Sequence, residues 1–281
     1  MARVGYFSTG NSLTVPGKNG SGMDNEGPMV VRPKAFKLSE KLTQASIMSQ
    51  QFYHRPDETM VILDWDDTVL PTSWLRKFGR AGATSRQLQQ LEVIEEGAKT
   101  FLKLASEVGN VVIVTNAKRG WVPSSAERFI PGVLPLLAKL PIVYARPPSS
   151  ETVVNPNWDE TTMLEWKEES MYTTIAEFYG HGTRSWKNVI TIGDSAWDME
   201  ALMEAVKQRP TKGTCRCKFL KLPQEPSIES IQRTTRILTE WLPIFVHFDG
   251  DVEVDFAMAE DELADTLQEL LFDRCQTDVT V

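Results

Sequence analysis

Three aspartates stand close together directly after an apolar segment of the chain. Asp64, Asp66 and Asp67 follow the segment 60–63, which has the composition of a buried strand. Clustered carboxylates repel one another and lose hydration on burial, unless a cation, ordered hydrogen-bond donors or solvent relieves the cost. Asp64 and Asp66 are therefore candidate ligands of a divalent metal ion, which prefers hard oxygen atoms. The plainer alternative is a polar turn, because Asp and Thr often end strands and begin loops.

Two further polar groups follow apolar segments later in the chain. Thr115 and Asn116 end one such segment, whereas Asp194 ends another and Asp198 comes four residues later. In a parallel sheet the carboxyl ends of all strands lie at the same edge, so these groups can converge although they are far apart in sequence. Each also has an alternative role: Thr115 could simply end a strand, and Asp198 could complete a helix cap that begins at Ser195.

Lys167 interrupts the apolar stripe of a helix expected over 161–179. The apolar residues on the same face are Leu164, Met171, Ile175 and Phe178. A lysine in such a stripe either packs its stem and extends its charge into solvent, or meets a functional partner. We favour a functional role for Lys167.

Together these residues resemble the motifs of the haloacid dehalogenase superfamily of phosphohydrolases. The resemblance covers about 61–198 and the strand that follows. The first motif, Asp-x-Asp-x-Thr after an apolar strand, is matched by Asp64, Asp66 and Thr68. The second, a strand-end hydroxyl, is matched by Thr115, and the third, a lysine upstream of the fourth motif, by Lys167. The fourth, Gly-Asp and a second Asp, is matched by Gly193, Asp194 and Asp198.

This resemblance implies a Mg²⁺-dependent phosphatase that works through an aspartyl phosphate. Asp64 would attack phosphorus, and Asp66 would protonate the leaving oxygen and then take a proton from water. The metal ligands would be Asp64, the main-chain carbonyl of Asp66 and Asp194, with Asp198 binding directly or through water.

The resemblance also implies which side chains bind the substrate. Thr115 and Lys167 would hold the phosphoryl oxygens, which also makes them catalytic, because electrostatic positioning is most of what phosphoryl transfer requires. Thr68 and Asn116 complete the expected substrate-binding set.

Members of the superfamily cover the site with a cap inserted after the first motif or between the second and third. Residues 71–83 are too few for a helical bundle, and 121–160 are mostly accounted for by a core helix and a strand. We therefore expect a minimal cap or none, and an open site that suits a phosphorylated macromolecule such as a phosphoprotein. Two alternatives stay open. A scaffold protein that lost turnover is disfavoured by the intact acids, and a phosphomutase by the missing cap.

Apolar strands that alternate with amphipathic helices predict an α/β fold, with a three-layer, Rossmann-like parallel sheet covered by helices on both faces. The expected strands cover 60–63, 110–116, 142–145, 188–194 and 214–222. The expected helices cover 39–52, 84–109, 124–140 with a proline break, 161–179, 195–207, 227–245 and 258–272. The second of these follows a loop with one helical turn over 70–83, and it begins with a possible capping box of Thr84 and Gln87.

Composition sets the domain organisation and excludes some partners. With 281 residues and 41% apolar content, the chain can bury a substantial core. We expect a flexible leader over 1–28, one catalytic domain over 29–247 and an acidic C-terminal segment over 248–281. The net charge of -8 disfavours nucleic acid as the main partner.

The cysteines and the absence of targeting signals indicate a reducing compartment. Cys215 and Cys217 are expected on one strand with side chains on opposite faces, and Cys275 is the third, so neither a disulfide framework nor a zinc site is indicated. No secretion signal or membrane-spanning segment is apparent, so we expect a cytoplasmic protein with no membrane partner.

Overall fold

The computed structural model describes residues 50–82, 84–152, 158–210 and 213–277. The leader expected over 1–28 and nearly all of the helix expected over 39–52 lie outside these residues. The chain from Phe52 onward belongs to one compact unit, to which the following description applies.

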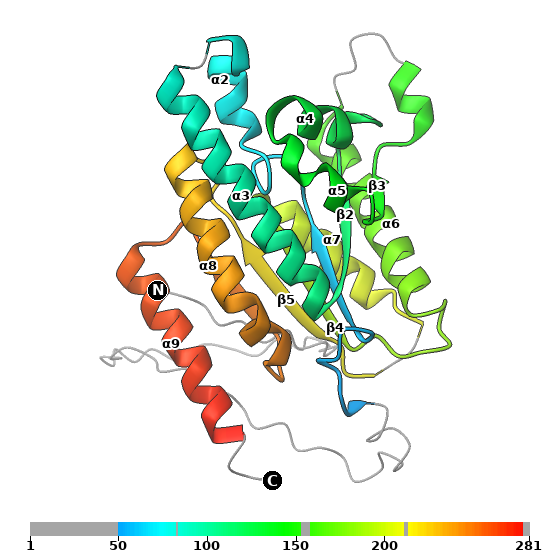
Figure 1. The fold of residues 1–281 in the computed structure, drawn as a ribbon. Helices are drawn as coiled ribbons and strands as arrows, with labels where there is room; N and C mark the ends of the chain where they lie inside the picture. The colour runs from blue at the N-terminus through cyan, green and yellow to red at the C-terminus, as the bar shows by residue number, and fades with distance from the viewer. Residues whose placement is uncertain (1–49, 83, 153–157, 211–212, 278–281) are drawn as a thin grey trace, which may run out of the picture. The chain divides into compact units, whose positions relative to one another are not determined.

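A six-stranded parallel sheet forms the centre of this unit (Figure 1), in the order β3-β2-β1-β4-β5-β6. The strands are β1 (Thr59–Leu63), β2 (Asn110–Thr115), β3 (Ile142–Tyr144), β4 (Asn188–Gly193), β5 (Arg216–Lys221) and β6 (Val252–Asp255). The last residue of β1, Leu63, pairs with Ile113 of β2 and Ile192 of β4. The carboxyl ends of these three strands therefore lie at one edge of the sheet. From β1 the later strands are added on both sides, and α/β proteins form ligand sites at the edge where the strand order reverses in this way.

Helices cover both faces of the sheet, which confirms the predicted three-layer α/β fold. The α-helices are α2 (Thr72–Gly82), α3 (Ser85–Val108), α4 (Trp121–Phe129), α5 (Leu134–Leu137), α6 (Glu160–Phe178), α7 (Ala196–Lys207), α8 (Ile228–His247) and α9 (Glu260–Thr277), with short 3₁₀ helices at Pro131–Val133 and Pro148–Thr152. Helices α3 and α8 pack together on one face, and α6 and α7 on the other. None of the helices in the described part of the chain is long and apolar enough to cross a membrane.

The alternation of side chains along β1 divides the core into two layers. Val61 and Leu63 belong to the apolar cluster with α3 and α8, whereas Met60 and Ile62 belong to the cluster with α6 and α7. Because successive residues of a strand point to opposite faces, one apolar strand supplies both layers. The buried strand in turn fixes the position of Asp64, the next residue.

The segment over 70–83 differs from the prediction, since it contains the helix α2 and not a loop with one turn. The main-chain N–H of Ser73 donates a hydrogen bond of 2.8 Å to Oδ1 of Asp67. Asp67 has a φ of 54°, which turns the chain so that its carboxylate reaches this first turn of the helix. This cap comes from six residues upstream, outside the spacing of an ordinary capping pattern.

The two neighbouring cysteines also differ from the prediction. The sulfur atoms of Cys215 and Cys217 lie 3.9 Å apart in the core layer beneath α7, so they share one face of the sheet. The expectation of opposite faces was wrong because side-chain direction in a strand has a period of two residues.

Strand β6 was not expected from the sequence. It pairs with β5 and buries Val252 and Val254, so the sheet extends into the acidic C-terminal segment. The helix expected after it is confirmed by α9, whose Leu263, Leu267 and Leu270 pack into the same core layer as α3.

Candidate active site

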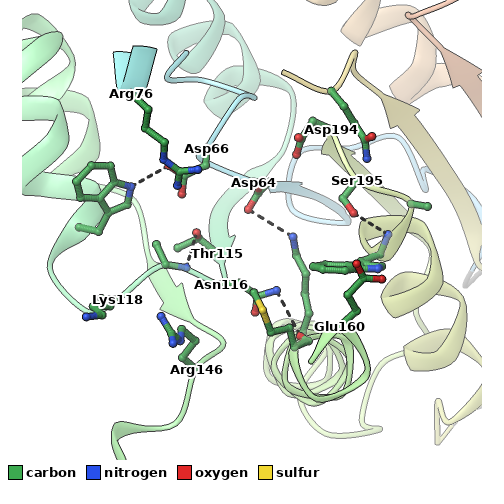
Figure 2. Close-up of a pocket in the computed structure, with 17 residues that line it drawn as sticks. Asp64, Asp66, Arg76, Thr115, Asn116, Lys118, Arg146, Glu160, Asp194 and Ser195 are labelled. Atoms are coloured by element: carbon green, nitrogen blue, oxygen red, sulfur yellow. Dashed lines mark hydrogen bonds and ion pairs between the residues drawn. The ribbon is translucent and has the colours of Figure 1, made fainter. Parts of the chain in front are cut away.

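A pocket of about 780 Å³ lies at the carboxyl edge of β1, β2 and β4 (Figure 2). The expected functional residues that line it are Asp64, Asp66, Thr115, Asn116, Lys167 and Asp194. Asp198 is buried behind this lining. Thr68 is also buried, and it is not one of the residues that line the pocket. The structure thus brings together groups from three strand ends and one helix.

Lys167 connects the two acidic motifs. Its ammonium nitrogen lies 2.6 Å from Oδ1 of Asp198 and 3.4 Å from Oδ1 of Asp64. The lysine is only 3% exposed, so its charge does not reach solvent, and the snorkelling alternative is wrong. Burial by itself lowers the pKa of Lys167, but the carboxylates of Asp198 and Asp64 outweigh burial and raise that pKa above its ordinary value. Lys167 is therefore a fixed positive charge beside Asp64.

Asp198 does not serve as the cap of helix α7. That cap is made by Ser195, whose hydroxyl oxygen accepts a hydrogen bond of 3.2 Å from the N–H of Trp197. Asp198 instead turns its Oδ1 to Lys167, while its buried Oδ2 has no hydrogen-bond partner among the described residues. Gly193 provides the space, because a Cβ at that position would lie 2.3 Å from this Oδ2. A buried, unpartnered carboxylate oxygen needs a cation or donor to offset its lost hydration.

Asp64, Asp194 and Asp198 form an acidic triad that fits a divalent cation. One carboxylate oxygen from each lies within 4.8 Å of the other two. Burial raises the pKa of Asp64, with a further increase from Asp198 and Asp194 that Lys167 only partly opposes. Burial and the nearby Asp198 likewise raise the pKa of Asp194 to about 7. These shifts reflect three carboxylates facing one lysine, and three hard oxygen ligands match the preference of ions such as Mg²⁺.

The carboxylate of Asp66 lies outside this triad. Its Oδ1 accepts a hydrogen bond of 2.6 Å from the hydroxyl of Thr72 and one of 2.9 Å from the indole N–H of Trp121. The first donor comes from α2 and the second from α4, so two helices fix this carboxylate at the pocket wall. Asp64 and Asp66 thus have different surroundings, which is the condition for giving two acids different roles.

Thr115 and Asn116 supply polar groups at the end of β2. The hydroxyl oxygen of Thr115 accepts a hydrogen bond of 3.1 Å from the N–H of Ala117, and within the described chain its own proton has no acceptor. The amide of Asn116 donates a bond of 3.3 Å to the carbonyl of Met163 on α6. Both side chains are oriented by neighbouring backbone and line the pocket, as an anion-binding wall requires.

Other lining residues had little or no sequence signal. Trp121 lies 55 positions from Asp66, so no local pattern could show their contact. Arg76 lies on α2, which was not predicted as a full helix. Arg146 directly follows the strand expected over 142–145, and that position at a strand end was the one signal available for it.

No protein-family model, curated protein or solved structure matches this chain.

Proposed function

We propose that this chain is a Mg²⁺-dependent phosphatase that hydrolyses phosphate monoesters through an aspartyl phosphate on Asp64. The observation that carries the proposal is the position of Asp64. Its side chain lines the pocket, lies beside the buried cation Lys167 and is one of the three members of the acidic triad. A carboxylate next to a fixed positive charge and a cation-binding cluster is suited to attack a phosphoryl group, whose own negative charge must be neutralised.

In the first step, an oxygen of Asp64 forms a bond to phosphorus while the bond from phosphorus to the leaving oxygen breaks. Asp66, protonated for this step, donates its proton to the leaving oxygen. Its Oδ1 accepts two hydrogen bonds, from Thr72 and Trp121, so the proton belongs on Oδ2. The step releases an alcohol and leaves a phosphoryl group on Asp64.

In the second step, Asp66 takes a proton from a water molecule that attacks phosphorus. The bond between phosphorus and Asp64 breaks, which releases inorganic phosphate and restores both carboxyl groups. Through both steps Lys167, Thr115 and Asn116 hold the phosphoryl oxygens by charge and hydrogen bonding.

Asp64, Asp194 and Asp198, together with the main-chain carbonyl of Asp66, would hold the Mg²⁺ ion. When bound, the ion supplies charge that neutralises the transferring phosphoryl group. The support for this assignment is the triad's oxygen spacing and the unpartnered Oδ2 of Asp198.

A phosphoprotein is the substrate class that we favour. In the described residues, only the helix α2 lies between β1 and α3, and the segment between β2 and α6 belongs to the same compact unit as the sheet. A site without a separate cap accepts a phosphorylated side chain on a larger surface.

The test of the reaction is Mg²⁺-dependent hydrolysis of phenyl phosphate by wild-type protein and by Asp64→Asn. We expect the variant to lose at least about a thousandfold in kcat, as when other covalent nucleophiles are removed. Acid quenching of wild type with labelled substrate should trap a phosphoryl group that Asp64→Asn does not acquire. The matched control is Asp57→Asn, since Asp57 is an exposed acid shortly before β1 and does not line the pocket. Equal turnover by wild type and Asp64→Asn, both folded, would contradict the proposal.

The test of the metal site is the rise in melting temperature on addition of Mg²⁺. We expect Asp194→Asn to lose this rise and Asp66→Asn to keep most of it, because the carboxylate of Asp66 is bound to Thr72 and Trp121. A rise that survives in Asp194→Asn and disappears in Asp66→Asn would place the ion elsewhere.

A further inference from the structure

The pocket has an acidic side and a basic side. The acids Asp64 and Asp194 belong to the ends of β1 and β4, whereas Lys118 and Arg146 follow the ends of β2 and β3. Figure 2 shows Lys118 and Arg146 together on the side of the pocket away from Asp194. The acidic side is accounted for by the proposed reaction, but the two cations have no role in it.

The pairing of β2 with β3 determines where Arg146 lies. Thr115 is aligned with Tyr144, and the N–H of Ala145 donates a hydrogen bond of 2.9 Å to the carbonyl of Thr115. Arg146, the next residue, therefore lies one strand further from Asp64 than Thr115 does. Two strand spacings amount to about 10 Å, so the chain at Arg146 lies well beyond a phosphoryl group bound at Asp64.

Arg146 is partly buried and lacks a counter-ion among the described residues. Its Nε is buried without a hydrogen-bond partner, and neither Arg146 nor Lys118 forms an ion pair with any described carboxylate. A guanidinium N–H that has lost water and gained no partner is costly, and an anion in the pocket would relieve that cost. Arginine also binds carboxylate and phosphate through paired N–H groups.

We infer that Arg146, assisted by Lys118, binds a second anionic group of the substrate. The substrate is then a phosphate monoester that carries a carboxylate or a further phosphate a short distance from its ester oxygen; in a phosphoprotein, this is a neighbouring acidic or phosphorylated side chain. This inference rests on the proposed function. It assigns Arg146 to specificity, whereas Lys167, Thr115 and Asn116 serve the phosphoryl group that is transferred.

The test compares phenyl phosphate with 3-carboxyphenyl phosphate and 1,3-phenylene bisphosphate. The two larger probes carry the second anion as a carboxylate or as a phosphate, and the one with the higher kcat/KM identifies which group the subsite prefers. We expect wild type to favour the better of these probes over phenyl phosphate by about tenfold in kcat/KM, mainly through KM. In Arg146→Ala this ratio should fall to near one, and Arg146→Lys should restore part of it.

The matched control is Arg76→Ala, which removes a positive charge from the α2 wall of the same pocket. We expect it to leave the ratio unchanged, so a general loss of positive potential is distinguished from loss of the subsite. The inference would be overturned if the ratio were the same in Arg146→Ala and wild type. If the ratio were unchanged because kcat/KM fell equally on all three probes, Arg146 would be assigned to the transferred phosphoryl group.

Binding to the Asp64→Asn protein separates the two proposals. Calorimetric titration with phenyl phosphate and with the preferred probe needs no turnover, so it measures binding at the subsite even if wild type hydrolyses neither compound. Tighter binding of the probe, lost in Asp64→Asn/Arg146→Ala, supports the subsite whatever the fate of the phosphatase proposal. Equal affinity for both compounds, or no binding of either, would overturn it.

Discussion

Lys167 and Asp198 form a buried ion pair between helices α6 and α7, with 2.6 Å between Nζ and Oδ1. The pair joins the two helices that cover one face of the sheet, and it places a positive charge beside Asp64. Both side chains are almost fully inaccessible to solvent, so neither charge can be hydrated if its partner is removed.

Substituting Lys167 by Met should strongly destabilise the protein, because it leaves Asp64 and Asp198 buried without their cation. We expect the free energy of unfolding in urea at pH 7 to fall by about 3–5 kcal/mol. The double variant Lys167→Met/Asp198→Asn should recover part of the loss. The control is Lys99→Met, which removes an exposed pair with Glu96 and should leave stability nearly unchanged. If Lys167→Met and Lys99→Met behave alike, the pair is not buried as described.

Substituting Gly193 by Ala should disturb the acidic triad, since the new Cβ would lie 2.3 Å from Oδ2 of Asp198. We expect a loss of about 1–3 kcal/mol in stability and a smaller rise in melting temperature with Mg²⁺. Gly97→Ala is the control, because its Cβ would meet nothing closer than 3.5 Å and it lies within helix α3. That change should stabilise the protein by up to about 1 kcal/mol. Similar effects of the two substitutions would argue against a tight fit between Gly193 and Asp198.

Substituting Trp121 by Phe should lower kcat while leaving KM for phenyl phosphate within about threefold, since the lost N–H holds Asp66 and not the substrate. We expect kcat to fall about tenfold. Thr72→Val, which removes the other donor to the same oxygen, should have a similar effect. Trp241→Phe, on helix α8, is the control for loss of an indole. An unchanged kcat in Trp121→Phe would show that this hydrogen bond does not position Asp66.

Lys218 should make stability depend on pH. Its side chain on β5 is fully buried, donates a hydrogen bond to Oδ1 of Asn188 and lies 5.6 Å from the ring centre of Tyr53. Burial, and then the charge of Arg216, lower the pKa of Lys218 to about 7. An unfolded lysine titrates near its ordinary 10.5, so between these values the unfolded state binds the extra proton and stability increases with pH.

Urea unfolding of wild type and Lys218→Met at pH 7 and pH 8.5 measures this effect as a difference, because the raised pKa values of Asp194 and Cys217 oppose the trend equally in both proteins. We expect wild type to gain about 1–2 kcal/mol relative to Lys218→Met over that interval, from a slope of at most about 1.4 kcal/mol per pH unit. The same slope in both proteins would mean that Lys218 does not titrate in this range.

The sequence predicted the parts of the fold that depend on neighbouring residues. The strands around Asp64 and Thr115, the capping box of Thr84 and Gln87, and the buried position of Lys167 all follow from local apolar periodicity or fixed spacing, and the structure confirms them. Parallel strands then bring their ends to one edge without further information. The convergence of the acidic motifs was therefore predictable.

The remaining features depend on contacts between distant residues. Helix α2 begins at a cap supplied from Asp67, and Asp66 is held by Trp121 from another helix. Strand β6 has only four residues, and its pairing with β5 is what identifies it as a strand. No spacing rule contains these contacts, because they arise when separate elements meet.

The central position of β1 affects how the chain folds while it is being synthesised. Thr59 pairs with Asn188, and the amide of Asn188 also donates a hydrogen bond of 2.9 Å to the hydroxyl of Thr59, across 129 positions. A ribosome adding roughly 5–20 residues per second needs on the order of ten seconds to cover that distance. From the synthesis of β2 until that of β4, β1 has β2 on one side and an unpaired apolar edge on the other. Nascent chains are thus exposed to edge-to-edge association until β4 emerges, and the acidic triad cannot assemble before then.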